Sequence, residues 1–519
     1  MTPGSAVGLA AGSIAAGVGG LRWLRVAQRE HYLPGSVTRF ALRWARSSPL
    51  NGGLPVAGVA LTGATAATPW AGVGAAAVVA AWPAGLGLRG RTSRLAWTRR
   101  MRTLAGVAGV LEAAGIAGGA VAGAPATAAA AGALLVPLAV DAACAITAPV
   151  ERRLGARYVR SAASRLRSVR PTVVAITGSY GKTTTKGYVA HLVSAARTVV
   201  ATPRSFNNRA GLARSVNENL GVGTEVFVAE MGTYGKGEIA ELCSFIPPDV
   251  SVITAIGPVH LERMGSEDAI AEAKSEILEK ARVAVLNVDD SRLAAIAEAE
   301  RSRRKVVTCS TRRGGGDVTV HRADGGLVVE AGGDVIATVA DPPRGDGRVP
   351  DRLPPMASNL ACAVAVALEL GVPRPALAER LSTVPPAPNR LTATTGAKGF
   401  LILDDTYNSN PAGCRAALET LEAIAPAGGR RVVVTPGMVE LGRRQYDENR
   451  EFARQAAAVA THLVIVGRVN RRALLDGSSE GAAQVVTVGT RQEAVAWVKD
   501  HLGPADAVLY ENDLPDHYP

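Results

Sequence analysis

The sequence lacks several features by which common classes of protein are recognised. Its five cysteines are scattered and no two form a C-x-x-C pair, so it indicates neither a zinc ribbon nor a disulfide framework. This pattern favours a reducing compartment. Aromatic residues make up only 4% of the chain. No positively charged residue precedes the first apolar run, which argues against a cleaved signal peptide.

Apolar residues, in contrast, are abundant. They make up 47% of the 519 residues, mostly as alanine, glycine and valine, and the mean hydropathy is +0.14. At roughly 150 residues for each domain, a chain of this length predicts about three domains. The net charge of +12 comes from arginines that gather beside apolar runs. This arrangement favours membrane topology over nucleic-acid binding.

Residues 1–150 have the pattern of a polytopic membrane segment. Uncharged runs cover residues 5–21 and 54–88, and the second is long enough for two short spans. The apolar runs 104–123 and 126–150 give two more candidate spans. Five spans with the N-terminus outside would place all three basic segments in the cytoplasm. We therefore expect about five spans in the cell membrane, with membrane lipid as a partner and the later domains cytoplasmic. The alternative is three or four spans, because alanine-rich spans insert weakly.

Two acidic residues, Glu112 and Asp141, lie inside predicted spans. A charged group in the bilayer is costly, so an acid there has two interpretations. It contacts a lipid headgroup or an ion, or it faces the helix bundle and bonds to backbone and hydroxyl groups. The sequence leaves both open.

A second region has the layout of a phosphate-binding loop. An apolar, β-branched run over residues 173–177 predicts a buried parallel strand. It is followed by the turn Gly178-Ser179-Tyr180-Gly181-Lys182-Thr183-Thr184. Glycines let backbone N–H groups surround an anion at a helix N-terminus. Lys182 would reach the β- and γ-phosphates of a nucleotide, and the Thr183 hydroxyl would contact Mg²⁺.

This loop is a moderately specific signal. Ile176 stands where the full G-x-x-x-x-G-K-[ST] pattern has its first glycine. The alternative is an ordinary strand-to-helix turn with an exposed lysine. The agreement of strand, turn and Lys-Thr favours the phosphate loop.

From residue 171 onward, strand and helix signals alternate, as is typical of an α/β sheet. Strands are predicted over residues 173–177, 225–231, 250–254, 281–287 and 305–309. The segment 385–388 contains three prolines and predicts a hinge, after which a second α/β pattern follows. We expect a connector helix over 151–170, an ATP-binding domain over 171–386, a Rossmann-like C-terminal domain over 387–509 and a tail over 510–519.

Polar clusters follow the predicted strands. Glu230 ends one strand with a carboxylate, which suits Mg²⁺. His260 stands two residues before Glu262, and this pair could hold a second metal ion. Further clusters occupy residues 272–276 and 404–411. Each could be an ordinary helix cap or surface group, but their shared order favours a function.

As an ordered set these motifs resemble the Mur ligase family, most of all its MurF type, which adds D-alanyl-D-alanine to the cell-wall precursor peptide. The resemblance runs from about residue 171 to 509. It rests on the loop 177–184, Asn207-Asn208, Glu230-Met231-Gly232, His260-Leu261-Glu262 with Gly265, Ala273-Lys274 with Glu276, Asn359, Asn389-Arg390-Leu391, residues 404–411 and Met438-Val439-Glu440-Leu441-Gly442.

The resemblance implies ATP, two Mg²⁺ ions and roles for single residues. The implied nucleotide-binding residues are Gly178, Ser179, Gly181, Lys182, Thr183, Thr184, Asn359, Arg390, Asp405 and Tyr407. The implied metal ligands are Thr183, Glu230, His260 and Lys274, with Lys274 carrying CO₂ as a carbamate. Lys182, Lys274 and His260 would be catalytic. The implied contacts to acceptor, phosphate or incoming amine are Asn207, Asn208, Asn408 and Asn410.

The implied reaction is carboxylate activation. A carboxylate attacks the γ-phosphate of ATP, an amine attacks the resulting acyl phosphate, and an amide and phosphate are released. Such chemistry requires positioning and neutralised charge more than a protein nucleophile. Closure of the domains about residues 385–388 would exclude water from the acyl phosphate.

The sequence departs from the family in three places. The N-terminal domain that grips the UDP part of the precursor is missing, and the membrane segment stands in its place. Pro436-Gly437 replaces the usual Gly-Asp, and the tail lacks the usual Lys-Gly-Ser. The first departure favours a membrane-attached acceptor, which would gain by proximity.

We therefore expect a membrane-anchored amide ligase in cell-envelope or peptidoglycan precursor synthesis. The alternatives are a poly-γ-glutamate-type polymerase, an ATP-driven transporter and a non-catalytic scaffold. The amide-ligase motifs argue against the transporter, and Lys182, Glu230, His260 and Lys274 together argue against the scaffold. The scattered cysteines disfavour a relative that amidates lipid II, since such relatives carry a four-cysteine zinc ribbon.

Overall fold

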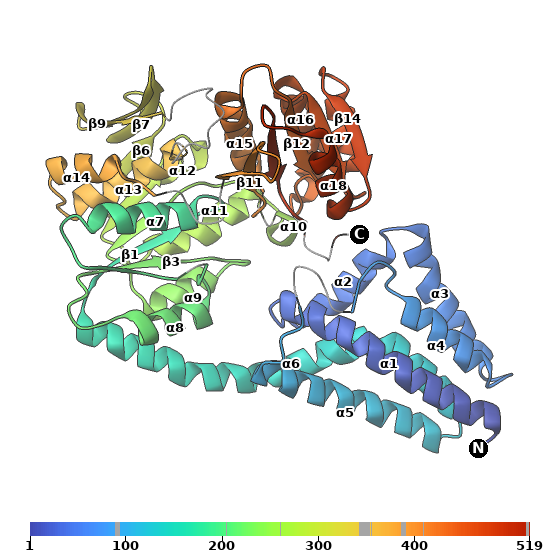
Figure 1. Cartoon of the computed structure of the whole chain (residues 1–519). Coiled ribbons are helices and arrows are strands. Elements are labelled where there is room, and N and C mark those ends of the chain that lie inside the picture. Colours follow the sequence, from blue (N-terminus) through green and yellow to red (C-terminus); the bar gives the residue numbers. More distant parts are fainter. Residues whose placement is uncertain are drawn as a thin grey trace. The chain divides into compact units, whose positions relative to one another are not determined.

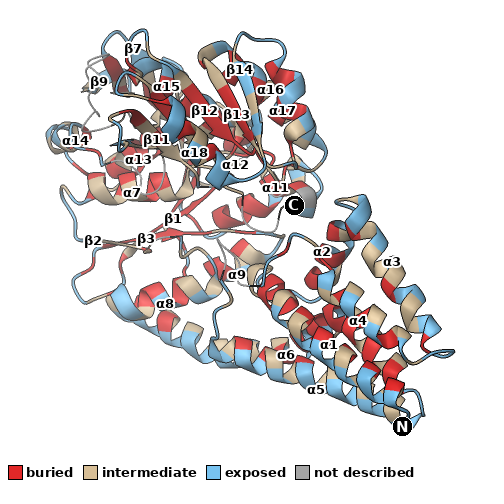
Figure 2. Cartoon of the chain, turned by 45° about the vertical axis from the view of Figure 1, so that its right-hand side comes forward, coloured by how far each residue is buried: buried red, intermediate tan, exposed pale blue. Residues whose placement is uncertain are grey.

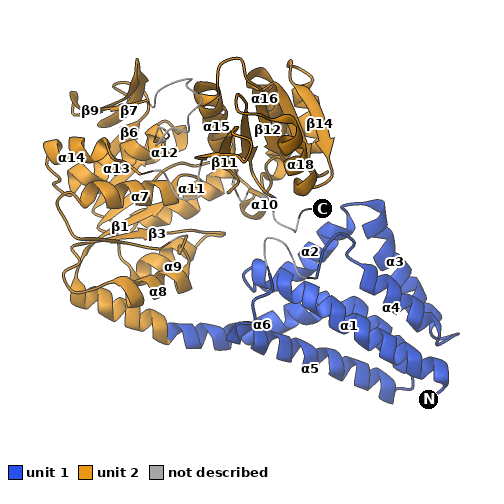
Figure 3. Cartoon of the chain, in the orientation of Figure 1, with its two compact units in different colours: residues 1–156, 514–519 blue, residues 157–513 orange. Residues whose placement is uncertain are grey.

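The protein is described by a computed structural model that covers residues 1–88, 94–203, 205–259, 261–341, 353, 355–385, 391–407, 409–514 and 518. The chain divides into two compact units (Figure 3). Unit 1 comprises Met1–Ala156 and Leu514–Pro519, and unit 2 comprises Arg157–Asp513. Helix α6 (Pro125–Val169) begins in unit 1 and ends in unit 2.

Unit 1 is helical. Besides the first part of α6, it contains α1 (Pro3–Arg29), α2 (Ser36–Ala45), α3 (Pro49–Ala64), α4 (Ala71–Ala81) and α5 (Arg99–Val121). Its core includes an aromatic cluster, in which the ring of Trp23 lies 5.2 Å from that of Trp82 and 6.4 Å from that of Phe40. Few residues of α5 are buried, and most of its surface is exposed (Figure 2).

Three helices in the described parts of the chain, α1, α5 and α6, are long and apolar enough to cross a membrane. Three of the predicted spans lie on these helices, and the total number of spans stays a prediction. The run 54–88 falls on α3 and α4, which have 16 and 11 residues. Both are shorter than the ~20 residues that a crossing helix needs. The predicted connector 151–170 is the continuous end of α6, which runs on to Val169.

Asp141 of α6 bonds to the N-terminus of α2. Its carboxylate accepts the backbone N–H groups of Val37 at 3.1 Å and Thr38 at 2.7 Å, and the Thr38 hydroxyl at 2.6 Å. A carboxylate at a helix N-terminus is favourable because it satisfies unpaired N–H groups and meets the positive end of the helix dipole. Of the two interpretations of Asp141, the structural one is confirmed.

Glu112 of α5 differs from Asp141. Its Oε1 atom is buried and has no hydrogen-bond partner within the described ranges. It faces Gly132 of α6, where an added Cβ would lie 2.6 Å from this oxygen. A lipid or ion contact at Glu112 stays a prediction.

The first part of unit 2 is built on a nine-stranded sheet in the order β2-β3-β1-β4-β5-β6-β7-β8-β9. In this order, the seven strands from β2 through β1 to β7 pair in parallel. Strands β7, β8 and β9 form antiparallel pairs. The strands are β1 (Thr172–Thr177), β2 (Val199–Ala201), β3 (Val226–Glu230), β4 (Val250–Ile253), β5 (Val283–Asn287), β6 (Lys305–Ser310), β7 (Val318–Ala323), β8 (Gly326–Ala331) and β9 (Asp334–Ala340).

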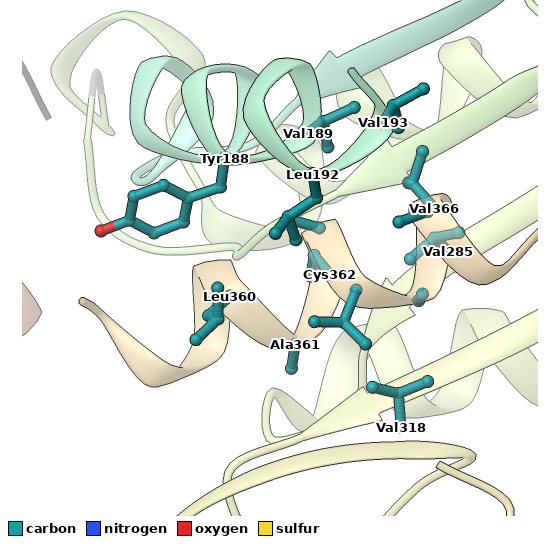
Figure 4. Close-up of a cluster of buried hydrophobic side chains, with 14 of the residues drawn as sticks. Tyr188, Val189, Leu192, Val193, Val285, Val318, Leu360, Ala361, Cys362 and Val366 are labelled. Carbon is teal, nitrogen blue, oxygen red and sulfur yellow. The ribbon is translucent and has the colours of Figure 1, made fainter. Parts of the chain in front are cut away.

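Helices cover both faces of this sheet (Figure 1). On one face α7 and α13 pack side by side over the strands, and Figure 4 shows Leu192 and Cys362 in that core. The end of α6 packs on the other face through Ala162 and Leu166, together with α8, α9, α11 and α12. The helices are α7 (Lys182–Val193), α8 (Arg209–Asn219), α9 (Glu238–Phe245), α10 (Leu261–Met264), α11 (Glu267–Ser275), η1 (Glu276–Leu278), α12 (Ser291–Glu300), α13 (Ala357–Glu369) and α14 (Arg374–Leu381).

The second part of unit 2 contains a six-stranded sheet in the order β10-β11-β15-β12-β13-β14. It is parallel except for β10. Its strands are β10 (Thr392–Thr395), β11 (Leu401–Asp405), β12 (Arg431–Thr435), β13 (His462–Val466), β14 (Gln484–Val488) and β15 (Ala507–Glu511). Its helices are α15 (Pro411–Ile424), η2 (Gly442–Arg444), α16 (Gln445–Val459), α17 (Arg471–Ser478) and α18 (Arg491–His501).

Candidate active site

The candidate site lies at the carboxyl ends of β3, β1 and β4, the second, third and fourth strands in the order of the nine-stranded sheet. In parallel sheets, ligands bind in the crevice outside these strand ends. Ile176 of β1 pairs with Glu230 of β3. The predicted phosphate loop and the predicted metal ligand therefore leave the sheet side by side, although they are about fifty residues apart in the sequence.

Two glycines give the loop its shape. Gly178 has φ +151°, and a Cβ at this position would lie 1.9 Å from the hydroxyl oxygen of Thr254. Gly181 precedes the first turn of α7 with φ +76°, and its Cβ would lie 2.2 Å from Oδ1 of Asn359. Side chains rarely adopt such backbone angles and would not fit here. The structure also places the predicted nucleotide residue Asn359 directly beside the loop.

Hydrogen bonds hold the loop closed. The Nζ of Lys182 donates to the carbonyl oxygens of Gly178 at 2.6 Å and Ser179 at 3.4 Å. The Ser179 hydroxyl donates to the Gly257 carbonyl at 3.1 Å and accepts the Gly257 N–H at 3.0 Å. Thr184 is buried in the first turn of α7. The loop therefore presents the ammonium of Lys182 at the N-terminus of a helix, where an anion is favoured.

Glu230 is the centre of a buried polar cluster and is only 1% exposed. Its Oε2 accepts the Thr183 hydroxyl at 2.9 Å and lies 2.9 Å from the Nζ of Lys186. Its Oε1 accepts the Nδ2 of Asn207 at 3.1 Å. The structure thus brings together three residues that the sequence singled out, Thr183, Glu230 and Asn207.

Lys186 was missed by sequence reasoning. Lysines in helices are usually exposed, so a lysine on the second turn of α7 carries no signal of its own. The available clue was its spacing, because residues four apart lie on the same face of a helix. Lys186 therefore follows Lys182 on the face of α7 that begins at the phosphate loop.

Lys274 lies in the last turn of α11 and is only 4% exposed. Burial lowers the pKa of its amine well below the usual value, and the positive charge of Lys182 lowers this pKa further. The two lysines are therefore close enough to repel each other. A neutral amine is the form that reacts with CO₂, so the environment of Lys274 is compatible with the predicted carbamate.

Three predicted residues have structural partners instead of open surroundings. Asn208 accepts the Gly211 N–H at 2.9 Å and caps α8, and Asn410 accepts the Gly413 N–H at 2.9 Å and caps α15. Glu276 accepts the N–H groups of Gly237 and Ala240 near the start of α9. These are ordinary helix caps. Substrate contact by Asn208 and Asn410 stays a prediction.

The second sheet contributes two of the predicted nucleotide residues. Asp405, at the end of β11, accepts the Leu391 N–H at 3.1 Å. The Tyr407 hydroxyl lies 3.1 Å from the hydroxyl of Ser205, which follows β2 in the first part of unit 2. Three further predictions, His260, Arg390 and Asn408, lie outside the described residues.

An ion pair also connects the two parts of unit 2. Glu267 of α11 bonds to Arg444 of η2, and its other oxygen lies 2.9 Å from a guanidinium nitrogen of Arg292. Tyr180 of the phosphate loop is close to this group, and the charges of Glu448 and Glu267 add to the burial that raises its pKa. The loop is thus in electrostatic contact with the second part of unit 2.

Within the described part of the chain, no group of three or more His, Cys, Asp or Glu side chains is arranged to hold a metal ion. The candidate ligands present are the oxygens of Thr183 and Glu230, 2.9 Å apart. Hard oxygen donors are the ligands that Mg²⁺ prefers. The second metal ion and the carbamate stay predictions.

Two family profiles match this part of the sequence. The Mur ligase middle domain matches residues 176–367, and the glutamate ligase domain of Mur ligases matches residues 389–510. The UDP-N-acetylmuramoyl-tripeptide--D-alanyl-D-alanine ligase of Mycobacterium tuberculosis (strain H37Rv) is 32% identical over 392 residues, which are 68% of this chain and 72% of that protein. The enzyme of the same name from Synechocystis sp. is 30% identical, covering 65% of this chain and 71% of its own.

Solved structures agree with this likeness. MurF from Acinetobacter baumannii superposes with a TM-score of 0.59 at 27% identity, over 69% of this chain and 77% of that one. MurF ligase from Thermotoga maritima in complex with ADP superposes with a TM-score of 0.57 at 25% identity, over 69% and 80% of the two chains.

Proposed function

The chain belongs to the Mur ligase family of ATP-dependent, ADP-forming ligases, and we propose that it joins a membrane-attached carboxylate to an amine in the synthesis of a cell-envelope precursor. The single observation that carries the catalytic half of this proposal is the convergence of the phosphate loop on Glu230. The Thr183 hydroxyl donates a hydrogen bond of 2.9 Å to Glu230, so the two candidate ligands for a nucleotide-bound cation are adjacent.

The donor set fits Mg²⁺. Thr183 and Glu230 would hold one ion, and Lys274 as a carbamate, with His260, would hold a second. When bound, Mg²⁺ neutralises charge on the phosphates during transfer. Of these residues, Thr183 and Glu230 have the supporting contact described above.

The chain's own residues would bind and orient the nucleotide. The backbone N–H groups at the start of α7 favour the phosphates, and the Lys182 ammonium would leave its carbonyl partners to contact them. Asn359 lies beside Gly181, where it can limit the position of the nucleotide. The ligase chemistry needs such preorganised charge at the γ-phosphate more than it needs a protein nucleophile.

Unit 1 supports the membrane half of the proposal. It supplies three apolar helices of spanning length among its described residues. Five of the six tryptophans lie between residues 23 and 97, and tryptophan is enriched where protein meets the membrane interface. Residues 1–156 carry fourteen arginines against four acidic residues, the charge bias of segments that flank membrane spans on the cytoplasmic side.

The place of the apolar helices in the sequence supports a membrane-attached acceptor. The family profiles begin at residue 176, after the three apolar helices. An acceptor held in the same membrane would meet the site at high effective concentration, because diffusion in two dimensions replaces a free encounter. The proposed substrate is therefore a peptide carboxylate on a lipid carrier, and the relatives' soluble UDP-linked peptide is the competing choice.

This choice can be tested with the full chain reconstituted in nanodiscs. ADP release is measured with a lipid-linked precursor peptide and with its UDP-linked equivalent, each with a panel of amino acids and dipeptides, and products are identified by mass spectrometry. The proposal predicts faster ligation of the lipid-linked peptide. Equal or faster ligation of the UDP-linked peptide would refute the membrane-attached acceptor and leave the ligase assignment intact.

A further inference from the structure

A buried ion pair lies inside the candidate site. The Nζ of Lys186 and Oε2 of Glu230 are 2.9 Å apart, and their side chains are 7% and 1% exposed. Both charges have been removed from water, which is costly unless each is paired and hydrogen-bonded. The other contacts of Glu230 come from the neutral groups of Thr183 and Asn207. Of these three side chains that contact the carboxylate of Glu230, those of Lys186, Thr183 and Asn207, only that of Lys186 is positively charged.

The fold holds this pair in place from both sides. Lys186 stands on the second turn of α7, between the buried residues Thr185 and Tyr188 on the same helix. Glu230 is the last residue of β3, and its neighbour Met231 bonds through its N–H to the Ile176 carbonyl at 2.8 Å. Both residues thus belong to regular elements, Lys186 to a helix and Glu230 to a strand end.

We propose that Lys186 is a positioning residue that neutralises Glu230 before metal and nucleotide arrive, and so weakens and orients the binding of a divalent cation at this carboxylate. An ionised carboxylate has about four acceptor positions, so Glu230 can keep Lys186 and still offer an oxygen to a cation. The presence of a cation at Glu230 rests on the proposed function, whereas the compensation of its charge by Lys186 does not.

The proposal predicts how the pair responds to substitution. Lys186→Met keeps most of the apolar length of the side chain and removes its charge, so Glu230 is left buried with an uncompensated charge. A divalent cation then supplies the missing positive charge. The variant should therefore unfold at a lower temperature without metal and bind a divalent cation more tightly than the unchanged protein.

The experiment uses the full chain in detergent without nucleotide. The melting temperature is measured in chelator and with added MgCl₂, and binding of Mn²⁺ is measured by electron paramagnetic resonance. The variants are Lys186→Met, Glu230→Gln and Lys186→Met with Glu230→Gln. Lys236→Met is the matched control, because Lys236 pairs with Glu272 at 3.0 Å on the exposed surface.

In Lys186→Met we expect a lower melting temperature that MgCl₂ partly restores, and Mn²⁺ binding tightened by roughly tenfold, since removing a neighbouring unit charge is worth at least that much in a partly buried site. The double variant should regain most of the lost stability and lose the metal effect. If Lys186→Met cannot be folded, a folded double variant supports the proposal equally.

Three results would overturn the proposal: a Lys186→Met protein that melts like the unchanged chain, a double variant no more stable than Lys186→Met, and unchanged Mn²⁺ affinity in a destabilised Lys186→Met. Failure of the proposed function gives a different pattern. In that case no form of the protein binds Mn²⁺ at this site, while the double variant still rescues the stability.

Discussion

The hydroxyl of Thr183 donates a hydrogen bond of 2.9 Å to Oε2 of Glu230. Thr183 is the second residue of α7, and Glu230 is the last residue of β3. This bond joins the helix that follows the phosphate loop to the strand end that carries the candidate metal ligand. Helix α7 follows β1, and β1 pairs with β3, so the sheet brings the two residues together.

Replacing Lys182 by alanine tests the phosphate loop. The variant loses the ammonium at the N-terminus of α7, and removal of one preorganised charged donor typically lowers turnover by about 10²–10³-fold. We expect amine-dependent phosphate release to fall to that extent, measured with the full chain in detergent. Lys236→Ala, on the exposed surface, should release phosphate at the normal rate. Normal turnover in Lys182→Ala would remove the loop from the mechanism.

Replacing Gly181 by alanine tests the shape of the loop. The new Cβ would meet Oδ1 of Asn359 at 2.2 Å, at a φ of +76° that side chains rarely adopt. Such strain costs about 1–3 kcal/mol, so ADP affinity measured by calorimetry should fall at least about fivefold. Gly187→Ala, in the same helix with open space around the new Cβ, is the control. Equal ADP affinity in both variants would contradict the loop geometry.

The lowered pKa of Lys274 predicts that the stability of the protein depends on pH. Its pKa is lowered in the folded protein, mainly by burial and also by Lys182, from the usual 10.5. Between the lowered pKa and 10.5 the unfolded chain binds more protons, so the free energy of unfolding rises with pH across this window, by at most about 1.4 kcal/mol for each pH unit. The slope ends above 10.5, where Lys274 is neutral in both states.

The measurement compares the unchanged chain with Lys274→Met. The melting temperature of the unchanged chain should rise more between about pH 7.5 and about pH 9.5 than that of the variant, since groups common to both cancel. Activity of the unchanged chain should also fall when CO₂ and bicarbonate are removed and return when they are added. Parallel pH curves, or full activity in Lys274→Met, would count against the assigned role.

The contacts of Arg444 predict that the second part of unit 2 influences ATP binding at the phosphate loop. It bonds to Glu267 of α11 and lies close enough to Tyr180 of the phosphate loop to affect its pKa. Such half-exposed pairs contribute about 0–1 kcal/mol, so Arg444→Gln should leave the melting temperature nearly unchanged. We expect its KM for ATP to rise by roughly threefold and to lose sensitivity to salt.

The matched control for Arg444 is Arg450→Gln. Arg450 pairs with Glu480 at 2.6 Å, and both residues belong to the second part of unit 2. This variant should keep the normal KM for ATP. If both variants behave alike, the ion pair of Arg444 does not couple the domains to the phosphate loop.

The sequence predicted the parts of the structure that depend on local pattern. Apolar β-branched runs predicted β1, β3 and β4, and the glycine spacing predicted the turn that Gly178 and Gly181 form. The order of the motifs indicated that Thr183 and Glu230 share a site, because parallel strands end at the same edge of a sheet.

Properties that depend on tertiary contacts were not predictable. Strand β2 is only three residues long and carries no periodic signal. Lys186 became visible only when α7 was placed against β3, because a lysine is normally solvent-exposed. The lengths of α3 and α4, 16 and 11 residues, were also not evident from the composition of the run 54–88.

The most direct test of the central claim is to measure ADP and amide product together. The full chain in nanodiscs receives ATP, Mg²⁺, a carboxylate acceptor and an amine, and each component is omitted in turn. The account predicts one amide for each ADP, no ADP above background when the acceptor is left out, and loss of both products in Lys182→Ala. ADP release that is unchanged without acceptor and amine, or that survives in Lys182→Ala, would contradict it.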